Sequence, residues 1–424
     1  MELIFSLNLA VAVILIVAPI WWSRRLLHLE WLNPVSLVVI SVLPVNLFRL
    51  FVGQVFRGDG LMDPSYQFAV LMTNVQQGIA LTLVVFASKL QVVREMPRWL
   101  PRFGRYQQID LRWFSRAFFL LYVAAFIILA MKTGGVADWL MNIRISYITK
   151  RDGNGLYYTA ALNFLSISYF FEGVSSTSSW RFTLRSVAFI AAIYILGSKG
   201  FVLDFFIFYL IIILRQRKVR VGRVLLIALP VAFLLLLVNF FSQLDVVELT
   251  SIAEYFEYYP NAAMYYADYF RGAIGLFEGK VFLTSFWEYA PRILFPEKPY
   301  VYGILHIVEI YFPGGAESGN TPAFEGGVPQ FADFGVLGVV FFAVLNLKPI
   351  LYFAGLRYTL MNGAFLQQGP MTGRAIIASL LLFAPAFGSF LPIGLLGLVL
   401  LFVIGHNKFI QMTIRAVRQA SSHR

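Results

Sequence analysis

The residues with the clearest capacity for chemistry are cations placed in apolar or aromatic surroundings. Lys199 stands inside the stretch "AIYILGSKGFVLDFFIFYLIIIL" (192–214), with glycines on both sides of it. A later segment, 270–312, adds four cations to a mostly apolar and aromatic run: Arg271, Lys280, Arg292 and Lys298. Lysine and arginine bind phosphate oxygens, arginine through paired N–H donors. These cations therefore favour an anion site, whose location depends on the elements that carry them.

One histidine and one carboxylate could supply acid–base chemistry beside the cations. His306 and Glu309 lie three residues apart in "LHIVEIY" (305–311), so they share a face if this piece is helical. A lone histidine in an aromatic segment is also a common structural residue, and this alternative stays open. The sequence contains no P-loop, dinucleotide fingerprint, HExxH or GxSxG motif. Any catalysis must therefore use a less familiar set of side chains.

The composition identifies the kind of chain that carries these residues. Of the 424 residues, 59% are hydrophobic and only 13% are charged, and the mean hydropathy is +0.73. A soluble protein would carry about 25% charged residues. The absence of cysteine excludes disulfides, thiolate metal sites and cysteine nucleophiles. We expect an all-α fold, a polytopic transmembrane helical bundle that forms a single membrane domain over residues 1–424.

About 11 stretches are long and apolar enough to cross a bilayer as helices. The first has no basic residues before it, so we read it as a span rather than a signal peptide. The predicted spans are 3–21, 34–53, 66–88, 115–131, 156–172, 182–198, 200–214, 223–242, 330–354, 375–390 and 392–409.

The basic residues predict the orientation of these spans. Of the 34 Lys and Arg residues, 23 fall in one alternating set of loops and ten in the other. Positive residues accumulate on the cytoplasmic side, so we expect the N-terminus outside and the C-terminus in the cytoplasm. The net charge of +12 is then a topology signal, and we expect no nucleic-acid partner. This topology places one long loop, 243–329, on the outer face between spans 8 and 9.

The same topology places the candidate cations outside. The run that holds Lys199 is too long for one crossing, so "GSKG" is predicted to be a tight outer turn between two spans. Lys199 there is either part of an anion site at a helix N-terminus or a lysine that reaches toward lipid headgroups. Arg144 lies in another outer loop, and a bundle could bring both residues near Arg271 and Arg292.

The long outer loop holds 11 of the 22 acidic residues and divides into three parts. Its tyrosine-rich beginning is typical of a lipid-interface belt, although tyrosines with carboxylates also suit sugars. Its middle has Pro291, Pro296 and Pro299, which prevent a continuous helix and predict an interfacial or re-entrant segment. Its Gly- and Pro-rich end, 313–335, is expected to be a mobile lid or binding loop.

Four short motifs together resemble the Wzy-type polymerases, which build O-antigen, enterobacterial common antigen or capsule. The outer turn "GSKGF" resembles their cationic turn, and "APRILFPEKP" resembles their proline-bounded loop segment. "GNTPAFEGGVPQFADFGVLG" resembles their glycine-rich return into a span, and the arginine of "NIRISY" sits where similar chains carry one. The resemblance covers roughly residues 132–345 and rests on the order of the motifs.

The resemblance implies a bacterial inner-membrane glycosyltransferase, related in fold to O-antigen ligases, whose active face is periplasmic. It would transfer a glycan from undecaprenyl diphosphate to another lipid-linked repeat unit, with no cofactor, metal or nucleotide sugar. A chain-length regulator is a further possible partner. The implied diphosphate-binding residues are Arg144, Lys199, Arg271 and Arg292. Glu309, His306 and Arg292 are the implied catalytic residues.

Three other functions remain as alternatives. An O-antigen ligase would move a finished glycan and would need a strong outer-loop histidine. A different polyprenyl-phosphate glycosyltransferase would depend on Asp59 or Asp63, which we otherwise read as solvated turn residues. A lipid-linked oligosaccharide flippase or other transporter would show paired halves and buried charges. The sequence has no such repeat, and its outward charges lie in loops.

Overall fold

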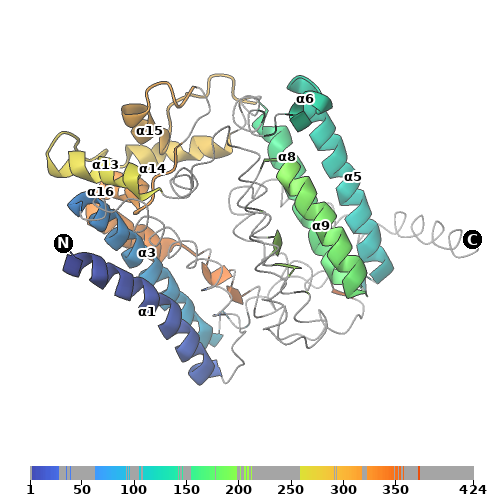
Figure 1. Cartoon of the computed structure of the whole chain (residues 1–424), viewed down its shortest axis with the longest axis horizontal. Coiled ribbons are helices and arrows are strands. Elements are labelled where there is room, and N and C mark those ends of the chain that lie inside the picture. The colour runs from blue at the N-terminus through green and yellow to red at the C-terminus, as the bar shows by residue number, and fades with distance from the viewer. Residues whose placement is uncertain are drawn as a thin grey trace, which may run out of the picture. The chain divides into compact units, whose positions relative to one another are not determined.

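The structure of the chain is a computed structural model, shown in Figure 1. It describes residues 2–27, 63–90, 105–106, 108–141, 154–176, 178–197, 258–290, 294–317 and 322–347, with isolated residues and short stretches elsewhere. One unit consists of Met1–Leu90, Ile148–Gly153 and Val231–Phe353. The other consists of Gln91–Tyr147, Asn154–Pro230 and Ala354–Arg424.

The described residues of the first unit include three long helices, which are α1 (Glu2–Leu27), α3 (Pro64–Lys89) and α16 (Val328–Leu345). α1 and α3 lie side by side (Figure 1) and are joined by amide side chains. The Asn8 amide donates to the Gln67 side-chain oxygen at 2.9 Å, and the Asn74 amide donates to the Asn8 carbonyl at 3.0 Å. Such hydrogen bonds hold apolar helices together where no water competes.

α3 begins at a defined cap. The Asp63 carboxylate accepts from the Ser65 backbone N–H at 2.9 Å, and Pro64 occupies the first helical position. The sequence predicted that Asp63 is a solvated turn residue. In the structure it is the N-cap that stabilises the start of α3. Asp59 lies outside the described residues.

α16 is not a continuous helix. Phe334 and Gly335 have non-helical backbone angles, and Gly335 has φ 61° and ψ −153°, a conformation that glycine tolerates. The kink frees the Ala332 carbonyl, which accepts from the Phe277 N–H at 2.7 Å. A Cβ on Gly338 would lie 2.3 Å from the Gln330 carbonyl oxygen, so only glycine fits this close approach. The outer loop is thereby attached to the kinked helix.

Four short helices come from the described part of the long loop 243–329: α13 (Tyr259–Phe270), α14 (Lys280–Thr284), the 3-10 helix η2 (Ser285–Tyr289) and α15 (Leu305–Tyr311). They gather around one end of α3 and α16 (Figure 1). The prediction that prolines prevent a continuous helix in this part of the loop is confirmed, because helix stops at Tyr289 and resumes at Leu305.

Two expectations for this loop are wrong where the structure describes it. Tyr259, Tyr265 and Tyr266 lie at most 1% exposed in the core between α3, α13 and α16, so they do not form a lipid-interface belt. The Gly-rich end is not a free lid around Gly326, which is buried, donates its N–H to the Thr73 hydroxyl at 3.1 Å and accepts from Tyr266 at its carbonyl, and its role as a binding loop stays a prediction. A Cβ on Gly326 would meet the Ala69 carbonyl at 2.9 Å.

The second unit is built from α5 (Gln108–Lys132), α6 (Val136–Met141), α8 (Gly155–Ser175) and α9 (Ser179–Ile195). α5 packs along α8, and Tyr169 of α8 stacks on Phe182 of α9 with ring centroids 5.9 Å apart. α9 ends at Ile195, and Gly197 just beyond it has φ 78° and donates its N–H to the Tyr194 carbonyl at 2.7 Å. The predicted break in the apolar run around Lys199 is therefore confirmed at Gly197.

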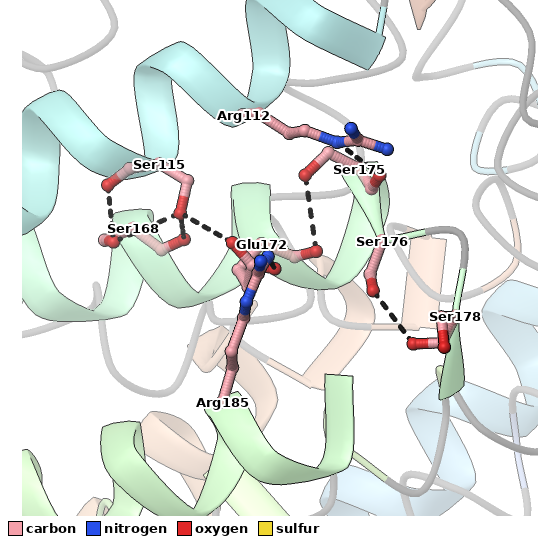
Figure 2. Close-up of polar contacts among 8 residues, drawn as sticks. All are labelled: Arg112, Ser115, Ser168, Glu172, Ser175, Ser176, Ser178 and Arg185. Atoms are coloured by element: carbon pink, nitrogen blue, oxygen red, sulfur yellow. Dashed lines mark hydrogen bonds and ion pairs between the residues drawn. The ribbon is translucent and has the colours of Figure 1, made fainter. Parts of the chain in front are cut away.

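A polar cluster ties α5, α8 and α9 together (Figure 2). The hydroxyls of Ser115 and Ser168 each donate to the other residue's carbonyl, at 3.0 and 2.7 Å. Ser115 also contacts the buried carboxylate of Glu172 at 3.4 Å, and the Arg185 guanidinium forms an ion pair with the same carboxylate. The Glu172 side chain is only 8% exposed, whereas that of Arg185 is 49% exposed.

This asymmetry predicts unequal costs for the two single substitutions. Arg185→Ala leaves a buried carboxylate without its cation and should destabilise the protein by roughly 1–3 kcal/mol. Glu172→Gln leaves a half-exposed arginine that water can solvate, so we expect about 1 kcal/mol or less. Thermal unfolding of the purified variants in one detergent checks the order. A larger loss for Glu172→Gln would contradict it.

Six of the predicted spans coincide with described helices: α1, α3, α5, α8, α9 and α16. Among the described residues, four segments are long and apolar enough to cross a membrane: Leu3–Arg25, Pro64–Lys89, Asp110–Lys132 and Val328–Leu351. The predicted spans 34–53, 200–214, 223–242, 375–390 and 392–409 lie wholly or largely outside the described residues.

The described elements also include a two-residue strand pair, which the all-helical expectation did not anticipate. β1 (Arg105–Tyr106) pairs antiparallel with β2 (Met371–Thr372). The two strands come from loops far apart in the sequence, so the pairing brings together the connection before α5 and a segment near the C-terminal end of the chain.

Candidate functional site

The proline-bounded part of the outer loop holds two cations close together; we call residues 290–302 the cation loop. The Arg292 guanidinium donates to the carbonyls of Lys298 and Pro299, the latter at 3.2 Å, and lies 4.1 Å from the centre of the Tyr300 ring. The Lys298 ammonium donates to the Ala290 carbonyl at 3.1 Å. The hydrogen bonds of the two cations therefore both stabilise the fold of the cation loop.

Lys298 is the more confined of these two cations. The residue is 9% exposed, and its ammonium lies 4.3 Å from the centre of the Tyr302 ring. Burial lowers the pKa of Lys298, the neighbouring Arg292 charge lowers it further, and Glu288 acts in the opposite direction. Within the described part of the chain, neither Lys298 nor Arg292 forms an ion pair with a carboxylate. Two adjacent cations without a paired carboxylate favour an anionic ligand.

Arg271 has a different environment from Arg292. Its guanidinium lies 3.7 Å from the Asp268 carboxylate, donates to the Ala267 carbonyl at 3.2 Å, and is 73% exposed. The same Asp268 accepts from the Tyr311 hydroxyl at 3.1 Å. Arg271 thus already has a counter-charge, which weakens its attraction for a second anion.

His306 occupies the first turn of α15, and the expectation that this piece is helical is confirmed. The residue is half-buried, and its Nε2 is buried with no hydrogen-bond partner among the described residues. Burial lowers the pKa of His306, and so does Lys280 of α14, whereas Asp333 of α16 raises it. The imidazole is therefore held toward its neutral form, which a general base requires.

Glu309 shares α15 with His306 but is engaged elsewhere. Its two carboxylate oxygens accept from the backbone N–H groups of Gly314 and Ala316, at 2.6 and 3.3 Å. These bonds fold the chain back after α15. In this arrangement the carboxylate holds a turn and has less freedom than His306 to contact a substrate.

Asp333 is a buried carboxylate that the sequence interpretation missed. It is 2% exposed, and its two oxygens accept from the backbone N–H groups of Val281 and Phe282, at 2.9 and 2.6 Å. It therefore fixes the start of α14, and with it Lys280, against the kink of α16. A single acid inside an apolar helix was the signal that could have found it.

Tyr265 is a second buried polar group in this part of the unit. The residue is fully buried, and its hydroxyl has no hydrogen-bond partner among the described residues. Burial raises the pKa of Tyr265, and the nearby Tyr269 and Asp333 raise it further. Asp333 and Tyr265 are thus two buried residues that the sequence analysis did not assign to the site, and Lys298, named there as a cation, was not assigned a binding role.

The other two predicted cations, Arg144 and Lys199, lie outside the described residues. The helices that precede them, α6 and α9, belong to the second unit and contact each other. The buried Trp139 of α6 donates its indole N–H to the Ile195 carbonyl, at the end of α9, at 2.8 Å. The segment before Arg144 and the segment before Lys199 are therefore joined, which agrees with the predicted topology.

The chain is similar over half of its length to curated O-antigen polymerases. It is 24% identical over 212 residues to the O-antigen polymerase of Salmonella typhimurium (strain LT2), which is 49% of this chain and 51% of that protein. The O-antigen polymerase of Salmonella typhi gives the same values. The chain spans about half the length of the curated relatives it matches. No protein-family profile and no solved structure matches the chain. The resemblance drawn from the sequence is thereby confirmed as a distant homology.

Proposed function

We propose that this chain is a bacterial inner-membrane glycosyltransferase that polymerises undecaprenyl-diphosphate-linked oligosaccharide repeat units on the periplasmic face. The observation that carries the proposal is the similarity to two O-antigen polymerases. The cation loop supports it, because Arg292 and Lys298 form a positively charged site without a paired carboxylate among the described residues. Both donor and acceptor would be lipid-linked, so the site must lie where the bilayer meets the outer loop.

The proposal includes the topology of about eleven spans in a single membrane domain, with the N-terminus outside. Two contacts support it. β1 and β2 pair although they come from different loops, and both loops belong to the positively charged, cytoplasmic set. The bond from Trp139 to Ile195 joins two positions that the same scheme assigns to the outer face. The loop 243–329, which supplies α13 to α15, is then periplasmic.

In the proposed reaction, the bond between the anomeric carbon and the diphosphate oxygen breaks, and an acceptor hydroxyl forms the new glycosidic bond. The departing diphosphate gains negative charge, which pre-positioned cations stabilise. We assign this role first to Arg292, and further diphosphate contacts to Arg144, Lys199 and Arg271. The reaction as proposed uses no metal or other cofactor, and a chain-length regulator would act as a separate partner.

The acceptor hydroxyl loses a proton during this transfer. His306 is the better placed base, because its Nε2 has no described partner and its pKa is lowered. Glu309, with both oxygens bound to backbone N–H groups, would orient the end of α15 rather than accept the proton.

The lowered pKa of His306 gives a pH prediction. A base with a lowered pKa stays neutral below the usual histidine value of about 6.5, so activity should persist there and fall only at more acidic pH. Polymerisation by the purified protein, measured across pH with wild type and His306→Gln, checks this. We expect the variant to be at least tenfold slower and to lose the acidic limb of the profile. A wild-type profile falling above the usual value would contradict it.

The proposed function is tested in cells that lack their own polymerase but make the matching repeat unit. Expression of this chain should convert surface glycan from a single repeat to a ladder on a gel. Loss of even the single repeat would favour a ligase or flippase instead. Asp59→Ala and Asp63→Ala serve as controls, and loss of the ladder in either, at normal protein levels, would favour the other class of polyprenyl-phosphate transferase.

A further inference from the structure

Aromatic side chains on α16, α14, η2 and the cation loop, which we call the aromatic track, lie near one another in the first unit. In α16, Phe334 and Phe342 have ring centroids 6.0 Å apart, and Phe342 lies 4.9 Å from Phe282 of α14. One turn later, Phe286 of η2 contacts Trp287 at 4.8 Å, and Trp287 contacts Phe295 at 6.2 Å. These contacts join α16 to α14 and, as a second group, η2 to the cation loop, and Phe282 and Phe286 are four residues apart in the chain.

Much of this track faces outward. The exposed fractions of Phe282, Phe286 and Phe295 are 52%, 56% and 48%, and the neighbouring Leu283 and Leu294 are 67% and 69% exposed. Exposed apolar residues on α16 belong to a candidate span, where bilayer lipid would cover them. Those on α14, η2 and the cation loop lie beyond the span, and a patch of this kind marks a surface that an apolar partner covers.

The track is held rigidly, so it is not a loose hydrophobic segment. Asp333 fixes the start of α14 through two backbone N–H groups. The Thr284 hydroxyl accepts from the Gly303 N–H at 2.8 Å and ties the end of α14 to the segment before α15. The Phe295 carbonyl accepts from the Lys298 N–H at 3.0 Å, so the last ring of the track and the buried cation belong to one turn.

We propose that this track binds the polyprenyl tail of the substrate whose diphosphate is bound by Arg292 and Lys298. The argument is complementarity: the ligand must be an amphiphile with a long apolar chain attached directly to an anionic head. A cation pair at the end of an apolar track matches that order, whereas a free nucleotide sugar would leave the track uncovered. This inference rests on the proposed function and names the part of the substrate that each surface contacts.

Binding measurements on the full chain in nanodiscs of fixed lipid composition test the inference. Two probes are compared, undecaprenyl diphosphate and inorganic pyrophosphate, on wild type and on the double variant Phe286→Ser/Phe295→Ser. We expect the variant to bind undecaprenyl diphosphate roughly tenfold to a hundredfold more weakly, because two ring contacts are lost. Its affinity for pyrophosphate should stay within about twofold, because the cation pair is retained.

Two further variants control this result. Phe286→Leu/Phe295→Leu keeps apolar side chains and should retain wild-type affinity within about threefold. Leu120→Ser changes a side chain of α5 that is also 68% exposed but lies outside the track, and should bind both probes normally.

Unchanged affinity of the serine variant for undecaprenyl diphosphate would overturn the inference and mean that bilayer lipids cover the track. An equal loss for both probes would also overturn it, because the rings would then act by supporting the cation loop. Binding is measured without turnover, so this experiment tests the inference independently of the proposed function. The proposed function could be wrong even if the lipid binds as expected. In that case wild type would bind the lipid but produce no ladder.

Discussion

Replacing Arg292 with alanine should reduce polymerisation by about a hundredfold to a thousandfold, the usual cost of removing one donor that stabilises developing negative charge. The reason is its position, since the guanidinium is fixed by two loop carbonyls and the Tyr300 ring and has no described carboxylate partner. In the complementation assay this loss should appear as a single repeat in place of a ladder. Protein levels in the membrane must be measured alongside.

Two variants separate charge from loop bracing. Arg292→Lys keeps the charge but lacks the planar guanidinium fork that reaches both carbonyls, so we expect an intermediate ladder. Arg181→Ala removes an exposed arginine at the start of α9 and should leave the ladder intact. A full ladder from Arg292→Ala at normal protein level would remove Arg292 from the reaction, and the cation loop would then be a structural turn.

The features that the sequence predicts well are those determined by local chemistry. A long apolar run indicates a span, as α3 and α5 illustrate. A glycine between two apolar runs indicates a break, and Gly197 provides it in a left-handed conformation. Three prolines within nine residues predict a non-helical segment, and this segment became the cation loop. None of these inferences requires knowledge of distant contacts.

The features that the sequence did not predict depend on contacts between distant segments. Tyrosines in α13 could face lipid or a protein core, and only packing against α3 and α16 decides for the core. The Gly-rich end of the loop has the composition of a lid, yet Gly326 is bound to Thr73, far away in the sequence. Glycine is common both in mobile loops and where two backbones pack closely. Composition alone therefore could not distinguish a mobile lid from a packed segment.

The cations illustrate the same limit at the candidate site. Arg271 and Arg292 are equivalent in sequence, each a single arginine in an aromatic segment. Their partners separate them, because Arg271 has Asp268 within 3.7 Å, while among the described residues Arg292 contacts carbonyls and a ring. Lys298 was named with the other cations of this segment, and it directly follows an acidic residue, Glu297. The structure shows no ion pair between them among the described contacts.

Asp333→Ala should be the most destabilising single substitution in the outer-loop region. The carboxylate is 2% exposed and accepts two backbone N–H groups. Each hydrogen bond to a charged group contributes about 1.5–3 kcal/mol, so losing both should cost roughly 3–6 kcal/mol. The free energy of unfolding of a typical protein is about 5–15 kcal/mol. We therefore expect the variant to have a lower level in the membrane and a lower melting temperature. Asp268→Asn, a half-exposed aspartate of the same unit, is the matched control and should cost about 1 kcal/mol or less.

The alternative to global destabilisation is local release of α14, and it has its own signature. α14 has five residues and cannot be stable as an isolated helix, so without Asp333 it should open while α3 and α13 stay folded. Hydrogen exchange would then show loss of protection confined to residues 280–289, at a normal membrane level. Because this segment carries Lys280 and half of the aromatic track, polymerisation should fail in either case. An Asp333→Ala protein with normal stability, normal exchange and a full ladder would show that the buried carboxylate does not fix α14.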